Sequence, residues 1–142
     1  MKTTRISQII ALALLTMTGF TSCKKEAETN PELSARVVGN YTLTGIVMGG
    51  KTYTVNAQTS GKMSAVRESA TTVNVTVDVI TSTSPANDVH FTATSVILQD
   101  ASNGEVTLTK DSFTLGKGGN NTLSIKIAPT NGSAPFELIG TK

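Results

Sequence analysis

The segment Thr72-Val73-Asn74-Val75-Thr76-Val77-Asp78-Val79 decides the fold class of this chain of 142 residues. Its four valines occupy alternate positions, and polar residues fill the positions between them. Because successive side chains of a β-strand point to opposite faces of the sheet, this alternation predicts a strand with one buried and one exposed face. No helical period persists over three turns from Val37 onward, so we expect an all-β domain over residues 37–142.

The same alternation recurs on both sides of this segment. It is clear in Glu105–Thr109 and Thr122–Ile127, and weakest in Lys62–Arg67 and Phe113–Leu115. In Val96-Ile97-Leu98 it breaks, which predicts either a β-bulge or a strand buried on both faces. Short segments rich in Gly, Asn and Pro mark the turns between the runs: Gly49-Gly50, Ser60-Gly61, Ser84–Asn87, Asn103-Gly104, Gly118–Asn120 and Asn131-Gly132.

About eight short strands at this spacing are typical of an antiparallel barrel or a β-sandwich, and periodicity does not separate the two. Val38–Gly45, which contains Gly39-Asn40-Tyr41, resembles the opening strand of calycin- or lipocalin-like barrels of Bacteroidota lipoproteins. Phe136–Lys142 is similar to their closing strand. The resemblance implies a small up-and-down barrel whose last strand pairs with its first, with the sandwich as the alternative.

The first 22 residues have the layout of a cleaved export signal. Lys2 and Arg5 precede a short apolar run, Ile9–Met17, and small residues follow it. Nine helical residues at about 1.5 Å each cannot cross a bilayer core of about 30 Å. We therefore predict a signal peptide over residues 1–22 and no permanent transmembrane helix there.

Cys23 follows this signal directly and is the only cysteine in the chain. Phe20-Thr21-Ser22-Cys23 resembles the lipobox of bacterial lipoproteins, in which the cysteine becomes the acylated first residue. Lys24–Glu28 is similar to the charged export tags of Bacteroidota surface lipoproteins. These resemblances imply a lipid anchor on Cys23 in the outer membrane, with the cell surface favoured over the periplasmic face.

Residues 23–36 are polar and lack periodicity, so we expect a lipidated, flexible tether. The chain after the signal has ten basic residues, the twelve of the whole chain less Lys2 and Arg5, against ten acidic ones. It is therefore nearly neutral, and no basic cluster indicates nucleic acid. A single cysteine excludes an internal disulfide, so the domain depends on packing.

Catalytic residues are not evident. His90, the only histidine, alternates out of phase with Val89 and Phe91, so we expect it to face away from the core. Glu68 and Asp78 could form a carboxylate pair, but nothing in their spacing requires one. No serine-nucleophile, zinc-protease or phosphate-loop motif is present. We therefore expect no enzymatic activity, no catalytic residue and no cofactor.

Metal ligands and binding platforms are equally scarce. Asp100–Glu105 resembles an oxygen-rich calcium loop but lacks alternate acidic ligands, and a hairpin turn at Asn103-Gly104 explains it, so we expect no metal. The Thr-x-Thr pairs are typical of the exposed face of half-buried strands. They are Thr42/Thr44, Thr52/Thr54, Thr92/Thr94 and Thr107/Thr109.

Two functions remain open from the sequence. In the first, a lipid-anchored barrel holds a small apolar or amphipathic ligand, whose binding residues are not identified. In the second, a solid β-domain serves as a structural or protein-interaction lipoprotein in the cell envelope. A cavity in the barrel interior would favour the first, and a fully packed interior the second.

Overall fold

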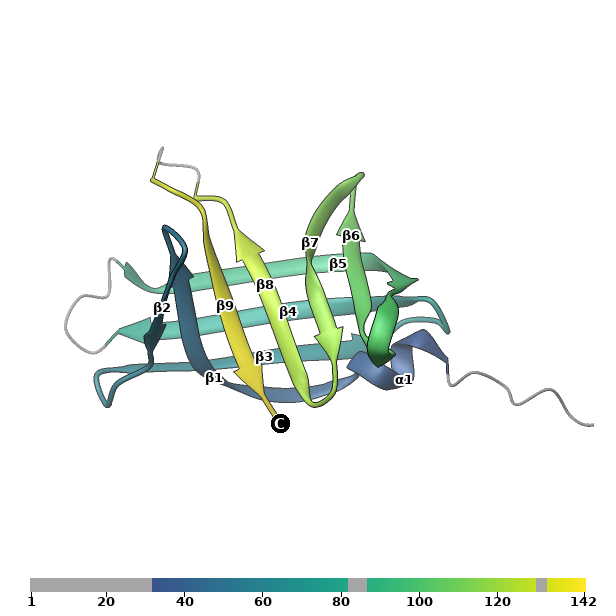
Figure 1. Cartoon of the computed structure of the whole chain (residues 1–142), viewed down its shortest axis with the longest axis horizontal. Helices are drawn as coiled ribbons and strands as arrows, with labels where there is room; N and C mark the ends of the chain where they lie inside the picture. The colour runs from purple at the N-terminus through teal and green to yellow at the C-terminus, as the bar shows by residue number, and fades with distance from the viewer. Residues whose placement is uncertain (1–31, 82–86, 130–132) are drawn as a thin grey trace, which may run out of the picture.

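The computed structural model describes residues 32–81, 87–129 and 133–142. Nine strands within these ranges form one antiparallel sheet, in the order β2-β1-β3-β4-β5-β6-β7-β8-β9 (Figure 1). A further pairing of β1 with β9 closes eight of the strands into a barrel and leaves β2 as an additional strand. The predicted all-β barrel is therefore confirmed in place of the sandwich. The predicted signal peptide and Cys23 lie outside the described residues.

From β3 to β9 each strand pairs with the next one along the chain, whereas β2 pairs with β1 outside the ring. The bounds of the elements are α1 Leu33–Val37, β1 Gly39–Met48, β2 Lys51–Thr54, β3 Thr59–Arg67, β4 Thr72–Thr81, β5 Val89–Asp100, the 3-10 turn η2 Ser102–Gly104, β6 Val106–Lys110, β7 Phe113–Gly119, β8 Thr122–Ile127 and β9 Phe136–Thr141. The closing register of β1 with β9 runs from Thr42 opposite Thr141 to Met48 opposite Phe136. Every pairing that closes the barrel thus lies between residues 39 and 141.

Strand β4 has the structure that its alternation predicts. Val73, Val75 and Val77 are fully buried and Val79 nearly so, all inside the barrel. Burying one such side chain contributes about 1.5–3 kcal/mol to folding. Because β4 pairs with β3 along its whole length and with β5 on its other side, it forms the centre of the core.

Strand β5 contains the predicted bulge. Its register against β4 shifts between Val73 and Val75, and Ser95 there has a φ of 51°. The Ser95 backbone N–H donates to Asn74 Oδ1 at 2.9 Å, which satisfies a donor that the ladder leaves unpaired. The bulge puts Val96 inside the barrel and leaves Ile97 half-exposed at 51%. The run is therefore not buried on both faces.

The turn predicted at Ser60-Gly61 is wrong, because both residues belong to β3. The chain turns at residues 55–58 instead, where Asn56 Oδ1 accepts a hydrogen bond from the Gln58 backbone N–H at 2.9 Å. Close packing explains the glycine at position 61, since a Cβ there would lie 2.8 Å from the Cβ of Leu43. The two weakest predicted strands, at Lys62–Arg67 and Phe113–Leu115, both form, as parts of β3 and β7.

Helix α1 closes one end of the barrel, at the lower right of Figure 1. Its residues 33–36 lie within the segment predicted to be flexible tether, yet Ser34 and Val37 are fully buried. The helix contacts β3, β5, β6 and β7, and the Ser34 backbone N–H donates to the Ala70 carbonyl oxygen at 3.1 Å. Across the described ranges, no helix has the length and apolar character that a membrane crossing requires.

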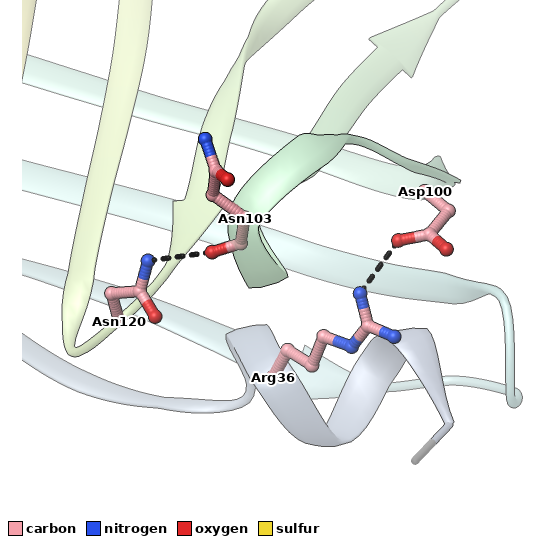
Figure 2. A network of polar contacts seen from close by, with 4 residues as sticks. All are labelled: Arg36, Asp100, Asn103 and Asn120. Atoms are coloured by element: carbon pink, nitrogen blue, oxygen red, sulfur yellow. Dashed lines mark hydrogen bonds and ion pairs between the residues drawn. The ribbon is translucent and has the colours of Figure 1, made fainter. Parts of the chain in front are cut away.

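Polar contacts fasten this closed end, as Figure 2 shows. Arg36 on α1 contacts Asp100 at the end of β5, with 2.6 Å between Nη1 and Oδ1. Nearby, the Asn120 side-chain amide donates to the carbonyl oxygen of Asn103 at 3.2 Å. The first contact joins α1 to the end of β5, and the second joins η2 to the β7–β8 turn. We call these elements together the cap.

Candidate functional site

A cavity of about 700 Å³ lies in the barrel at the end opposite α1. At this end β1, β4 and β8 finish and β5 and β9 begin, on the left and top of Figure 1. Ligand sites of proteins have volumes of about 300–1,000 Å³ and are common in the mouths of barrels. We call this cavity the mouth.

The wall of the mouth is mainly apolar. Val79 and Leu138 are 3% and 1% exposed and belong to its floor. Above them, half-buried or partly exposed apolar side chains complete the wall: Ile46, Met48, Val89, Ile127, Pro129, Ala134 and Phe136. A ligand with an apolar body would therefore contact aliphatic and aromatic groups on several strands.

Below this floor the interior is filled by larger side chains. Tyr41, Met63, Leu108, Leu123 and Ile125 are all fully buried in one cluster with the β4 valines. The barrel is thus packed at the α1 end and hollow at the other. This arrangement places the cavity on a rigid base, because close-packed cores deform little.

The strand pairings explain why the hollow lies at this end. The pairing of β1 with β3 stops at Thr42 opposite Lys62, and from Gly45 onward β1 pairs with β2 instead. The pairing of β5 with β6 covers only Ile97–Asp100. Within the described strands the barrel therefore loses two of its inter-strand ladders toward the mouth, and its walls separate.

One carboxylate stands in the wall of the mouth. Asp88, just before β5, is half-buried, and its Oδ1 accepts hydrogen bonds from the Thr81 backbone N–H at 2.7 Å and from the Thr81 hydroxyl at 3.0 Å. Thr59, Asn87 and Ser133 add neutral polar groups nearby. No lysine or arginine lines the mouth among the described residues.

His90 borders the mouth at the start of β5, but its side chain is 66% exposed. Its Nδ1 lies 3.0 Å from Asp78 Oδ1 on the outer face, so the prediction that His90 faces away from the core is confirmed. Asp78 and Glu68 do not come together: Asp78 lies opposite Lys62, whereas Glu68 follows the other end of β3, beside Thr72. There Glu68 accepts a hydrogen bond from the Ser95 hydroxyl at 3.0 Å. The structure thus shows no support for a carboxylate pair.

The loop Asp100–Glu105 contains a turn in place of a ligand cage. Asp100 is engaged by Arg36, and Ser102–Gly104 form η2. In the described part of the chain, no three His, Cys, Asp or Glu side chains gather as metal ligands would. The threonines of the Thr-x-Thr pairs lie exposed or half-exposed on the outer faces of their strands.

A second, more polar hollow of about 470 Å³ lies across β1, β3 and β4. Its polar residues are Asn40, Thr42, Lys62, Ser64, Thr76 and Asp78. The sequence leaves open a cavity in the barrel interior, but it does not identify the residues that line the mouth or this second hollow. The mouth residues Val89, Ile127 and Phe136 lie at the ends of alternating runs. This position shows that they line the mouth only when the closure of the barrel is known.

The chain has the fold of a putative outer membrane protein from Bacteroides fragilis, known from a crystal structure. The likeness is one of fold. The two chains are 20% identical, with a TM-score of 0.51 over 79% of this chain and 53% of the other, so this chain spans about half the length of that protein. No protein family and no curated protein matches the sequence.

Proposed function

We propose that this protein is a lipid-anchored binding protein of the cell envelope, which holds a small apolar or amphipathic ligand in the mouth of its barrel without catalysis. The observation that supports this function is the cavity of about 700 Å³ with apolar walls over a packed floor. A cavity of this kind excludes water from an apolar ligand and contributes about 25 cal/mol for each Å² of apolar surface buried.

The location in the envelope rests on the sequence and on the fold. The apolar run Ile9–Met17 and Cys23 have the layout of a lipoprotein signal, and a protein of the same fold is described as a putative outer membrane protein. Nine residues, 24–32, separate Cys23 from α1. Even fully extended they span at most about 30 Å, so an acylated Cys23 would keep the barrel close to the membrane.

Binding in the mouth can be tested with N-phenyl-1-naphthylamine, a neutral apolar dye that fluoresces when it leaves water. The protein to use spans residues 24–142, which include every contact that closes the barrel. We expect a saturable rise in fluorescence with about one dye per chain. The absence of a saturable signal from the folded protein would overturn the proposed function.

Two tryptophan variants test where the dye binds. Ile127→Trp fills part of the mouth, so we expect it to weaken dye binding at least about tenfold, which corresponds to about 1.4 kcal/mol. Val66→Trp adds the same side chain on the outside of β3, where Val66 is 59% exposed, and should bind like the wild type. Circular dichroism checks that both fold, and equal dye binding by the two variants would exclude the mouth as the site.

The anchor is tested separately in cells. Cys23→Ala should release the protein from the membrane fraction and end incorporation of labelled palmitate, because the acceptor thiol is gone. Thr29→Ala, a nearby substitution that keeps the thiol, should change neither. If the Cys23→Ala protein stays in the membrane fraction, the anchor lies elsewhere.

The alternative function is a protein-interaction lipoprotein. One observation favours it: Phe113, at the β6–β7 turn, is 77% exposed. Large exposed apolar side chains often mark binding surfaces. Under this alternative, Phe113→Ser would lose a partner in co-purification from membranes, while dye binding in the mouth would stay unchanged.

A further inference from the structure

The charge of the mouth is set by one side chain. Asp88 is the only acidic or basic group of the described wall, apart from His90, whose ring contacts Asp78 outside. Lys51 pairs with Met48 across the β1–β2 turn but lies on β2, outside the wall. The mouth therefore combines apolar walls with a single negative charge.

The carboxylate of Asp88 is held in a fixed place. Both described hydrogen bonds come from Thr81, one from its backbone N–H and one from its hydroxyl, and both go to Oδ1. A carboxylate has about four acceptor positions on its two oxygens, so Oδ2 keeps capacity to accept from a ligand. Since Asp88 is half-buried, a charge facing it is screened less than one in open water.

The apolar floor lies below this carboxylate. Val79 is two residues before Thr81 on the same inward face of β4, and Phe136 and Leu138 line the mouth from β9. A ligand that uses both features has an apolar body and a head group that donates hydrogen bonds. A protonated amine meets this requirement with three donors and a positive charge.

We propose that the mouth selects amphiphiles with a cationic amine head, with Asp88 as the counter-ion of the head and the floor as the site of the tail. This inference rests on the proposed function and specifies its ligand class. A ligand with a carboxylate head would place like charges side by side and is disfavoured. An alcohol head donates one hydrogen bond without the charge and is intermediate.

Dodecylammonium, dodecanol and dodecanoate test this order, because they share one tail. Each is tested for displacement of N-phenyl-1-naphthylamine from the protein of residues 24–142 at neutral pH, with the two charged compounds below their micelle concentrations and the alcohol below its solubility limit. We expect the amine to displace the dye at about tenfold lower concentration than the alcohol, and the carboxylate to require the highest concentration. Equal displacement by the amine and the alcohol would overturn the proposal.

Asp88→Asn removes the charge and keeps an oxygen to accept from Thr81. The dye should still bind, while the advantage of the amine over the alcohol should fall below about threefold. The matched control is Asp111→Asn, in the β6–β7 turn at the same end of the barrel but outside the wall. It should keep the tenfold preference, and a preference that survives in Asp88→Asn contradicts the role of Asp88.

A third measurement requires no variant. Raising the salt concentration shortens the Debye length to about 3 Å at 1 M. The advantage of the amine over the alcohol should then shrink, although less than for a pair in open water because Asp88 is half-buried, while dye binding stays. A salt-independent preference would overturn the counter-ion role even if Asp88→Asn failed to fold. If the dye binds neither the wild type nor the two variants, the proposed function is overturned. If the dye binds but the head groups show no preference, only this inference is overturned.

Discussion

The phenol of Tyr41 donates a hydrogen bond to the backbone carbonyl oxygen of Val37 and so ties β1 to the helix that closes the barrel. Tyr41 is 2% exposed, and Lys142 Nζ lies 5.0 Å from the centre of its ring. The same ammonium donates to the Val38 carbonyl oxygen at 2.8 Å. These contacts hold α1 in place at the packed end of the barrel.

Tyr41→Phe should destabilise the protein by about 1–3 kcal/mol, because the buried Val37 carbonyl loses its partner. Urea unfolding followed by circular dichroism measures this. Tyr53→Phe is the control, since Tyr53 is 48% exposed on β2 and its change should stay within about 0.5 kcal/mol. If both substitutions lower the free energy of unfolding equally, the hydrogen bond of Tyr41 does not stabilise the protein.

Alkaline pH should destabilise the protein through Tyr41. Burial disfavours the phenolate and raises the pKa of Tyr41 to about 12, above its unfolded value of 10.0. The stability linked to this shift is therefore complete below about pH 10 and is lost as the pH rises through about 12, by about 3 kcal/mol in all. Urea midpoints across this range measure the loss, and a Tyr41→Phe protein with the same alkaline loss would assign it to other groups.

Gly118→Ala should destabilise the packed end by about 1–3 kcal/mol. A Cβ at Gly118 would lie 2.9 Å from Cγ1 of Val37, whose branched side chain is fully buried and has little room to move. At Gly45 a Cβ would meet its nearest neighbours at 3.7 Å, an ordinary contact. Gly45→Ala should therefore be neutral or slightly stabilising in the same thermal unfolding measurement. If Gly118→Ala is equally neutral, α1 adjusts more freely than the packing indicates.

Asp100→Asn should weaken the cap by about 1 kcal/mol, since it removes the charge that faces Arg36. The Arg36 side chain is only 13% exposed, so the loss should persist at moderate salt. The comparison is Glu32→Gln, which removes the charge of the more exposed Arg67–Glu32 pair and should cost close to nothing. A greater loss from Glu32→Gln, in chemical unfolding of both variants, would reverse this ranking.

Local alternation predicts a strand best at β4, where one face is buried along the whole strand. At β2 the alternation does not correspond to a buried face, because all four residues are exposed. It fails at Ser60-Gly61 because a glycine required for close packing against Leu43 has the same signature as a turn. Helix α1 has five residues, too few for a helical period, and it forms because the end of the barrel buries Ser34 and Val37.

The candidate site depends on features that no single segment contains. The mouth exists because the β1–β3 and β5–β6 ladders stop short of it, and ladder lengths follow from the closed barrel. Asp88 has no motif around it. Its place in the candidate site is evident only from its hydrogen bonds with Thr81 and from the apolar wall. The resemblance of Val38–Gly45 and Phe136–Lys142 to barrel strands predicts closure itself, and the pairing of β1 with β9 confirms it.

The pairing of β1 with β9 has a consequence for how the protein folds. Thr44 on β1 donates to the carbonyl oxygen of Ile139 on β9, a residue 95 positions later in the chain. Where the chain emerges to fold, neighbouring hairpins can form first, but the ring stays open until residues 136–141 arrive. A shortened product would expose the edges of β1 and β8, which invite aggregation and attack by proteases. The barrel can therefore close only in a chain that includes β9.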